Sequence, residues 1–293
     1  MRILITGSQG FIGKHLTDYF QSLGFDVVGF DLQNKDDIRD AEQVESVVRE
    51  ADVVIHLAGV ASHNYSWKFP EETIKTNILG MTNILESCRI NDVEKLIFAS
   101  SVEVYGNQTE FPIKETAPLR PESPYAATKA SCEMLCQSYM RTYSLPIVII
   151  RQSNIYGVGQ SASEYGAVIP KMINNILTEK PILITGGGWQ TRDFVYIDDL
   201  IKFYKFNVSN NYYVGETVNY GTSVETSIWD VAQKIHKLLL KKETNFVLAP
   251  RRRCEIDRFV IDNRKTKYFG LEPRINFDKG LKRTIEWWNI SDT

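Results

Sequence analysis

Residues 1–31 have the sequence MRILITGSQGFIGKHLTDYFQSLGFDVVGFD. The apolar run ILIT predicts a buried strand, and the periodicity after it predicts a helix from about Phe11 to Leu23. Gly24 suits the left-handed turn that follows a helix, and the apolar run DVVGFD comes directly afterwards. We therefore predict that the chain begins with a strand, a helix and a second strand, which together form one βαβ unit.

The same alternation continues through the first half of the chain. Further strands are predicted at DVVIHLAG, KLIFAS and PIVIIR, and further helices over about Pro70–Arg89 and Pro124–Tyr143. Strands with this apolar content are typical of parallel sheets that are buried on both faces by their crossover helices. We predict an α/β protein with a Rossmann-type doubly wound parallel sheet.

Three glycines, Gly7, Gly10 and Gly13, stand at the first strand-to-helix turn. Glycines at such a turn allow a pyrophosphate to approach the backbone, and the helix N-terminus offers it free N–H groups and a positive dipole end. Asp31 ends the next strand, where a carboxylate can bind ribose hydroxyls and repel a 2′-phosphate. The pattern predicts a dinucleotide site that favours NAD, and Lys35 keeps NADP open as an alternative.

A candidate catalytic set lies further along the chain. Tyr125 and Lys129 are four residues apart in a predicted helix and therefore share one face of it. A nearby cation stabilises a phenolate, so we expect Lys129 to lower the pKa of Tyr125. Ser101 and Glu103 follow the strand KLIFAS, at the strand ends where parallel sheets place their ligand sites. A tyrosine with a pKa near the working pH is suited to remove a hydroxyl proton.

The second half of the chain has a different pattern of predicted strands and helices. After Arg151 a glycine- and serine-rich stretch begins, and the predicted elements become shorter. We predict an NAD-binding domain over residues 1–155 and a smaller C-terminal α/β substrate-binding lobe over residues 156–293. A strand and a helix near residues 216–241 are candidates to return to the first sheet.

The composition excludes several classes of partner. The 293 residues carry 34 Lys and Arg against 36 Asp and Glu, a net charge of −2. A chain with so little net charge has no strong positive electrostatic potential that would attract nucleic acid or an anionic membrane. The longest apolar runs are too short to cross a bilayer, and the first residues lack the pattern of a signal peptide. We expect a cytoplasmic protein with neither partner.

Cysteine and histidine are scattered, four of each, without the spacing of a zinc site. We therefore expect no metal. The two carboxylates Asp198 and Asp199 open a predicted helix, where they are more simply N-terminal charges than metal ligands. Reduced thiols in the core are expected at Cys88, Cys132, Cys136 and Cys254.

The motifs together resemble the extended short-chain dehydrogenase/reductase family. They are TGxxGxxG at the start, HLAG, Asn77, SSVEVYG, YAATK, RQSNIYG and QTRDFVYIDD, in this order along nearly the whole chain. The resemblance is closer to the branch of NAD-dependent nucleotide-sugar epimerases and dehydratases.

The resemblance implies roles for individual residues. Tyr125 is implied as the acid/base on a sugar hydroxyl, Lys129 as the residue that lowers its pKa and binds the nicotinamide ribose, and Ser101 as a hydrogen-bonding partner of the same sugar oxygen. Glu103 corresponds to the glutamate of an acidic or polar pair in the 4,6-dehydratases, whose other member is replaced here by Val102. The implied cofactor residues, besides Tyr125 and Lys129, are Gly7, Gly10, Phe11, Ile12, Gly13, Asp31, Asp37, Ile38, Leu57 and Ala58.

The resemblance also implies a nucleotide-diphosphate sugar as substrate. A nearly neutral protein must bind a diphosphate through placed donors, and the arginine fork suits that task. Arg192 and Arg252 are the candidates, with Asn154 as a further substrate contact. Arg251 and Arg253 stand beside Arg252, so each of them is an alternative candidate for the arginine of this motif. Cys254 replaces the glycine that is usual in the motif. A homodimer through the helices of about Pro70–Arg89 and Pro124–Tyr143 is implied as well.

The function predicted from these residues is an NAD-dependent nucleotide-sugar 4-epimerase of the UDP-hexose type, which works through a transient 4-keto sugar. A 4-ketoreductase and a 4,6-dehydratase are the alternatives. The short spacing between Asp31 and Asp37 is typical of some ketoreductases, whereas elimination of water needs a proton donor that Val102 cannot supply. A non-catalytic dinucleotide-sensing protein is a remote alternative.

Overall fold

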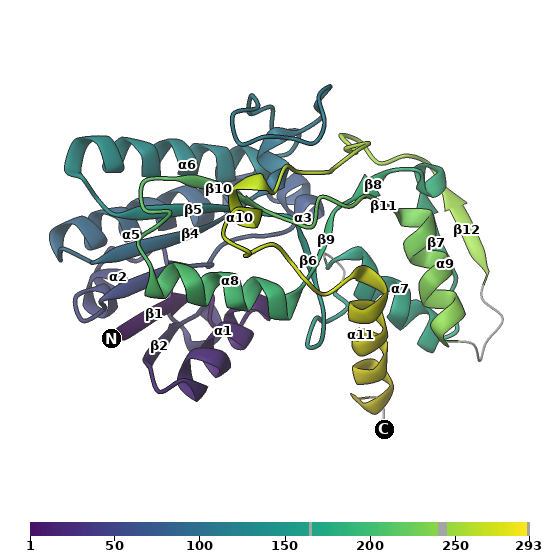
Figure 1. Ribbon diagram of the computed structural model, residues 1–293, viewed down its shortest axis with the longest axis horizontal. Helices are drawn as coiled ribbons and strands as arrows, with labels where there is room; N and C mark the ends of the chain where they lie inside the picture. The colour runs from purple at the N-terminus through teal and green to yellow at the C-terminus, as the bar shows by residue number, and fades with distance from the viewer. Residues whose placement is uncertain (164–165, 240–244, 292–293) are drawn as a thin grey trace. The chain divides into compact units, whose positions relative to one another are not determined.

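A six-stranded sheet is the framework of the first half of the chain (Figure 1). The computed structural model describes residues 1–163, 166–239 and 245–291. The strand order is β10-β5-β4-β3-β1-β2, and the pairs from β5 to β2 are parallel. The predicted Rossmann-type parallel sheet is therefore confirmed. The strands are β1 (Arg2–Thr6), β2 (Asp26–Phe30), β3 (Val53–His56), β4 (Lys95–Ser101), β5 (Ile147–Gln152) and β10 (Thr217–Tyr220).

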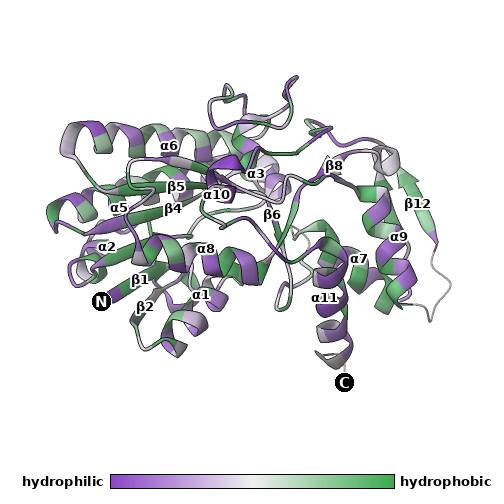
Figure 2. Cartoon of the chain, in the orientation of Figure 1, coloured by the Kyte–Doolittle hydropathy of each residue, from purple (hydrophilic) through white to green (hydrophobic). Residues whose placement is uncertain are grey.

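The central strands are buried along their length. Every residue of β3 and β5 is buried, and so are the first six residues of β4. Figure 2 shows β4 and β5 largely in the colour of hydrophobic residues. This burial is what a parallel sheet requires when helices cover both of its faces.

The helices that follow these strands agree with the predicted periodicity. α1 (Phe11–Ser22) ends before Gly24, which has φ +80°, and α6 (Pro124–Tyr143) has the predicted bounds. The helix predicted over about Pro70–Arg89 is present as three segments with a π-helical turn in the middle. These are α4 (Pro70–Ile74), the π-helical η2 (Lys75–Leu79) and α5 (Gly80–Ile90). The first half also contains α2 (Ala41–Val48), α3 (His63–Lys68) and the short 3-10 helices η1 (Leu32–Asn34) and η3 (Val102–Tyr105).

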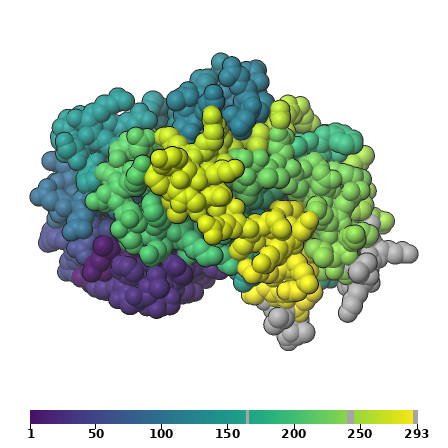
Figure 3. Space-filling view, in the orientation of Figure 1, coloured from purple at the N-terminus to yellow at the C-terminus, as the bar shows by residue number. Residues whose placement is uncertain are grey.

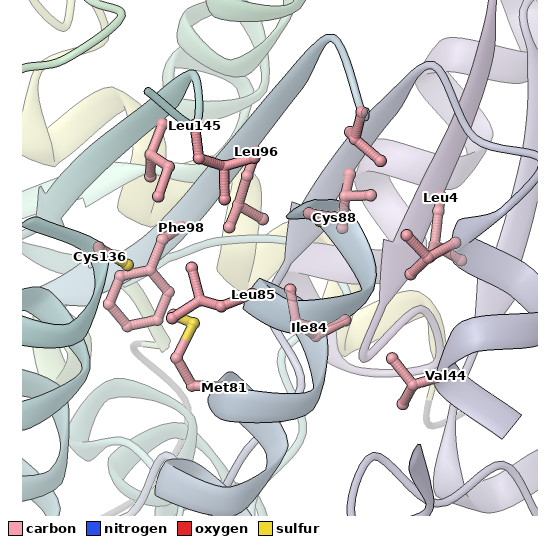
Figure 4. Close-up of a cluster of buried hydrophobic side chains, with 14 of the residues drawn as sticks. Leu4, Val44, Met81, Ile84, Leu85, Cys88, Leu96, Phe98, Cys136 and Leu145 are labelled. Carbon is pink, nitrogen blue, oxygen red and sulfur yellow. The ribbon is translucent and has the colours of Figure 1, made fainter. Parts of the chain in front are cut away.

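α5 supplies a large part of the core beneath the sheet. Its buried side chains recur at helical spacing and form one apolar face. Figure 4 shows this face lying against strand side chains such as Leu4, Leu96 and Phe98. The residues of α5 in the cluster are Met81, Ile84, Leu85 and Cys88.

The four cysteines are all free, but they do not all lie in the core. Cys88, Cys132 and Cys136 are buried, as predicted, and burial raises the pKa of the Cys132 thiol to about 11. Cys254 is exposed, so the prediction that it is a core thiol is wrong. The arginines that flank it, Arg251 to Arg253, are exposed as well, and they keep this stretch at the surface.

The chain divides into two compact units, and each is interleaved in sequence. The first consists of Met1–Gly106, Pro118–Gln152 and Ile201–Asn219, and the second of Asn107–Ala117, Ser153–Leu200 and Tyr220–Thr293. The predicted single boundary after residue 155 differs from this division in residues 153–155, which group with the second unit, and in two longer stretches. Asn107–Ala117 groups with the second unit, and Ile201–Asn219 returns to the first.

Of the strand and the helix predicted to return to the first sheet, the strand does so and the helix does not. β10 joins the edge of the sheet beside β5, as expected for the strand. The helix after it, α9 (Ile228–Leu239), belongs to the second unit, while most of the preceding α8 (Ile197–Ser209) belongs to the first. Residues 240 and 241 of the predicted helix lie outside the described residues. The N-terminal βαβ segment forms the purple surface of the first unit in Figure 3.

The second unit contains three two-stranded sheets. The pairs are β6 with β9 and β7 with β12, both parallel, and β8 with β11, antiparallel. Across the described ranges, no helix is long and apolar enough to cross a membrane. The elements of this unit are β6 (Asn154–Tyr156), α7 (Val168–Leu177), β7 (Ile182–Thr185), η4 (Gly186–Gly188), β8 (Thr191–Arg192), β9 (Phe194–Tyr196), β11 (Thr226–Ser227), α9, β12 (Phe246–Ala249), α10 (Arg264–Lys267) and α11 (Phe277–Ser291).

Candidate active site

Two glycines of the turn between β1 and α1, Gly7 and Gly13, leave no room for a side chain. Gly7 has φ +72°, and a Cβ on it would lie 2.8 Å from the Ala58 nitrogen. A Cβ on Gly13 would lie 2.1 Å from the Gly7 carbonyl oxygen. Gly10 is the N-cap of α1, and within the described residues no side chain caps this helix. A helix N-terminus of this kind presents the N–H groups of its first turn, from Phe11 on, to an anion.

Asp31 is held at the carboxyl end of β2. One carboxylate oxygen accepts the Gln9 N–H at 2.9 Å, and the other accepts the Gln33 N–H at the same distance. The bond to Gln9 ties the carboxylate to the glycine-rich turn. The predicted contact of Asp31 with a ribose stays a prediction.

The other predicted cofactor residues are placed as follows. Ala58 donates its N–H to the Thr6 hydroxyl at 3.2 Å, and Leu57 donates to the Thr6 carbonyl, so both lie behind the glycine-rich turn. Asp37 pairs with Arg39 at 2.7 Å, and the hydrogen bond from Arg39 holds the pKa of this carboxyl below its usual value. The side chain of Ile38 is packed into the core cluster rather than exposed to a ligand.

Ser101 and Tyr125 meet at the carboxyl end of β4. Ser101 caps η3 by accepting the Glu103 N–H at 3.2 Å, and it is hydrogen-bonded to the Tyr125 phenol. Tyr125 is the second residue of α6, whose start is fixed by Pro124 and by the Ser123 hydroxyl, which accepts the Ala126 N–H. The structure therefore brings the predicted serine and tyrosine together.

Tyr125 is protonated in this environment. Burial raises its pKa well above the usual value, the negative charge of Glu103 raises it further, and the hydrogen bond with Ser101 acts in the opposite direction. Lys129 donates to the Ala99 carbonyl at 2.8 Å and lies over the Phe98 ring. The ammonium is thus directed at the strand backbone, and the lowering of the Tyr125 pKa by Lys129 stays a prediction.

A histidine that sequence reasoning missed lies beside this set. His63, the first residue of α3, approaches Glu103 with 3.1 Å between Nδ1 and Oε2. Its ring packs edge-on against Trp67, with 4.5 Å between the ring centroids. Forty positions separate His63 from Glu103 in the sequence. Apart from the presence of a histidine, the residues around His63 gave no indication of this contact.

A buried network of hydrogen bonds and an ion pair holds the carboxyl end of β4. Glu133 of α6 is completely buried, pairs with Arg151 at 2.6 Å and accepts the Ser100 hydroxyl. Arg151 also donates to the Tyr105 hydroxyl at 2.7 Å. This network joins β4, β5, η3 and α6, and it was invisible in the sequence because its members are far apart.

His56, at the end of β3, is buried and has partners within the core. Its Nδ1 lies 2.8 Å from the Thr6 hydroxyl, and its ring stacks on Phe98. Burial lowers its pKa to about 3, with a further contribution from the charge of Lys129.

In the second unit, the two predicted arginines, Arg192 and Arg252, both pair with Glu255. Arg252 binds both of its carboxylate oxygens at 2.7 Å, and Arg192 binds one of them at 3.0 Å. Arg251 instead donates to the Glu255 carbonyl and pairs with Asp257. This arrangement favours Arg252 over Arg251 as the partner of Arg192.

The remaining predicted residues of the second unit have partners within it. Asn154 donates its side-chain amide to the Asp193 carbonyl at 3.2 Å. Asp199 accepts the N–H groups of Arg274 and Ile275, and Asp198 pairs with Arg283. Over the ranges that the structure describes, no group of three or more His, Cys, Asp or Glu residues is arranged to hold a metal ion.

Comparison with known proteins identifies the family. The model of the NAD dependent epimerase/dehydratase family matches residues 3–221. A putative UDP-glucose 4-epimerase of Methanocaldococcus jannaschii is 34% identical over 97% of both chains, and the human dTDP-D-glucose 4,6-dehydratase is 30% identical over 98% of this chain and 89% of its own. The chain belongs to the NAD dependent epimerase/dehydratase family.

Solved structures agree with this assignment. The UDP-glucose 4-epimerase of Thermotoga maritima, crystallised with UDP-glucose, has a TM-score of 0.93 at 30% identity and covers both chains fully. The UDP-glucose 4-epimerase of Thermus thermophilus, crystallised with NAD, has a TM-score of 0.91 at 30% identity and covers 99% of each chain. The glycine cradle and Asp31 fit the same cofactor, so the chain is an NAD-dependent enzyme.

Proposed function

We propose that the protein is a nucleotide-sugar 4-epimerase of the UDP-hexose type. The observation that carries the proposal is the contact of Ser101 with Tyr125 at the end of β4, one helical turn from Lys129. Relatives named as UDP-glucose 4-epimerases support the choice of sugar nucleotide.

In this proposal the proton chemistry belongs to Tyr125 and Ser101. Tyr125 as phenolate removes the proton from the hydroxyl on carbon 4, and Ser101 hydrogen-bonds the same oxygen. NAD, when bound, would supply a reversible hydride acceptor for carbon 4. Tyr125 then returns its proton to the oxygen, which completes inversion without loss of atoms.

The binding roles proposed for single residues follow the sequence predictions. The glycine turn and Asp31 hold the pyrophosphate and the adenosine ribose, and Lys129 holds the nicotinamide ribose and adds the positive charge that a phenolate needs. Arg192 and Arg252 hold the sugar-linked diphosphate. Support comes from their shared partner, because Glu255 pairs with both guanidinium groups and so keeps them close together.

We infer further that the protein works as a cytoplasmic homodimer, without nucleic acid or membrane as partner. Free, buried thiols in the first unit suit a reducing compartment. Large apolar side chains are exposed along α4 to α6, and a second copy would bury them. These side chains are Ile74, Leu79, Ile90, Met134 and Tyr143.

A 4,6-dehydratase is the second candidate, and the contact of His63 with Glu103 favours it. Elimination of water from a 4-keto sugar needs one group to take the proton of carbon 5 and another to protonate the departing hydroxyl. Val102 cannot donate a proton, but a histidine paired with a glutamate can supply both groups. The human dehydratase among the relatives is consistent with this reaction.

Incubation with UDP-glucose in deuterated water, followed by mass spectrometry and NMR of the product, separates the candidates. A 4-epimerase produces the epimer without change of mass and without net reduced cofactor. Loss of one water with deuterium in the sugar ring would establish the dehydratase. A ketoreductase would leave UDP-glucose unchanged but would reduce a 4-keto nucleotide sugar and consume added NADH or NADPH, and a protein that binds NAD but converts neither sugar would be a sensor.

A further inference from the structure

The loop after β2 folds back on Asp31, the residue predicted to bind the ribose of the cofactor. Asp31 and Asp36 are joined by two hydrogen bonds. The Asp36 carboxylate accepts the Asp31 N–H at 3.1 Å, and the Asp31 carbonyl accepts the Asp36 N–H at 3.2 Å. The 3-10 helix η1 lies between these two residues. The side chain of Asp36 is therefore held against the backbone of Asp31.

The carboxylate of Asp31 is fixed at the same place. One of its oxygens accepts the Gln9 N–H of the glycine-rich turn, and the other accepts the Gln33 N–H, both at 2.9 Å. An aspartate carboxylate cannot lie far from its own backbone nitrogen, and it is this nitrogen that donates to Asp36. The two carboxylates therefore lie close together, next to the glycine-rich turn.

The charges of these two carboxylates are not compensated by a cation. Over the ranges that the structure describes, neither Asp31 nor Asp36 pairs with a lysine, arginine or histidine. Their neighbour Asp37 differs, because Arg39 binds it at 2.7 Å. Asp31 and Asp36 are both half-buried, so water and salt screen their charges only in part.

Two uncompensated charges at this position bear on the choice between NAD and NADP. The two cofactors differ only at the 2′ position of the adenosine ribose, where NADP carries a phosphate with about two negative charges. NAD presents a neutral hydroxyl there, which can donate a hydrogen bond to a carboxylate. A like charge without a cation nearby selects against a ligand by repulsion.

We propose that Asp36 is a specificity-determining residue for NAD: it adds a second charge against a 2′-phosphate and holds Asp31 in place through the Asp31 N–H. The proposal rests on the contact of Asp31 with the ribose that the proposed function uses. Lys35, which has φ +71°, then does not open the site to NADP, because its neighbour Asp36 contributes the opposite charge.

The test measures the dissociation constants of NAD and NADP by calorimetry, with the full-length protein freed of copurified nucleotide. Asp36→Asn removes the charge but keeps an oxygen that accepts the Asp31 N–H. We expect the affinity for NADP to rise about tenfold, as for partly screened charges several ångströms apart, and the affinity for NAD to change less than about twofold. NADP is measured by displacement of NAD where its own heat of binding is too small.

A second variant separates the charge of Asp36 from its hydrogen bond. Asp36→Ala removes both, so NAD should bind more weakly, because Asp31 is no longer held. The ratio of the two dissociation constants should still shift toward NADP, by at least the factor seen in Asp36→Asn. Added salt should narrow this ratio more in the wild-type protein than in either variant, because it screens the repulsion.

The matched control is Asp18→Asn, which removes an exposed carboxylate of α1 and should leave the ratio unchanged. An unchanged ratio in Asp36→Asn, or an equal shift in Asp18→Asn, would overturn the proposal. Asp31→Asn tests the ribose contact itself and should weaken NAD binding. A loss in Asp31→Asn without a shift in Asp36→Asn means that only the role of Asp36 fails. These titrations need no turnover, so failure of the epimerase proposal is seen separately, in the sugar assay.

Discussion

Tyr125 is held in a site that favours its protonated form. Its side chain is 8% exposed, and both burial and the charge of Glu103 work against ionisation. The cation nearest in sequence on the same helix face, Lys129, is bonded to the Ala99 carbonyl. An acid/base in this setting can accept a proton only after positive charge is brought to it, so the proposed chemistry depends on the loaded cofactor site.

At this residue we predict that Tyr125→Phe leaves fold and NAD binding intact but removes most of the activity. Positioned acid/base catalysis typically contributes about 10² to 10⁴ in rate, and phenylalanine keeps the ring without the proton. Steady-state kinetics and calorimetric titration with NAD measure the two effects. Retention of more than about a tenth of the wild-type kcat would show that another group is the base.

At Arg252 we predict that substitution by alanine raises KM for a nucleotide sugar far more than it lowers kcat. A diphosphate contact is the same in the ground state and the transition state, and losing a charge-assisted pair costs about 2 to 4 kcal/mol. Arg251→Ala is the matched control, because Arg251 is engaged with the Glu255 carbonyl and Asp257. A larger rise in KM in the control would shift the assignment to Arg251.

At the scale of elements, the turn from β1 to α1 combines two separate requirements. Gly13 permits packing, because a Cβ there would lie 2.1 Å from the Gly7 carbonyl oxygen. Gly10 has ordinary φ of −71°, and its Cβ would lie 3.2 Å from the same oxygen, which a small shift can relieve. The missing side chain of Gly10 is therefore more important for binding a ligand at the start of α1 than for the fold.

The two glycines should therefore respond differently to alanine. Gly13→Ala should lower the melting temperature strongly, because backbone must move, with a cost of about 1 to 3 kcal/mol or more. Gly10→Ala should nearly keep the melting temperature but weaken NAD binding at least about tenfold, which corresponds to about 1.4 kcal/mol. Thermal melting and calorimetry distinguish the two. Equal effects of both substitutions on melting would show that Gly10 is also needed for packing.

At the scale of the whole molecule, buried titratable groups make stability depend on pH. His56 is buried between β1 and β4, and its pKa of about 3 lies below the ordinary value of 6.5. Between these values the unfolded chain binds a proton that the folded chain excludes. This contribution to stability is therefore complete above pH 6.5 and is lost progressively as the pH falls.

We predict that lowering the pH from about 6.5 to about 5 removes about 2 kcal/mol of unfolding free energy through His56. His56→Gln, which cannot be protonated, should lose this part of the pH dependence even if it is less stable at neutral pH. Denaturant unfolding at both pH values, followed by circular dichroism, gives the difference. The same pH dependence in the variant would mean that other groups are responsible.

Much of the fold could be predicted because its signals are local. The bounds of α6 follow from Ser123, Pro124 and the apolar periodicity, and the glycine turn with Asp31 follows from the chemistry of one βαβ unit. The candidate residues Ser101 and Tyr125 were also accessible, since the carboxyl ends of parallel strands carry ligand sites. Each of these conclusions needs only neighbouring residues and the rules of parallel sheets.

The sequence by itself therefore determined the class of fold, the cofactor and the tyrosine that the proposed chemistry uses. Only the tertiary structure decided that His63 meets Glu103, that Arg192 and Arg252 share Glu255, and that Lys129 is directed at Ala99. It also decided that Asn107–Ala117 and Ile201–Asn219 change units. The physical reason is that periodicity and turn chemistry are encoded in adjacent residues, whereas hydrogen bonds and ion pairs between distant segments depend on where the folded chain brings them.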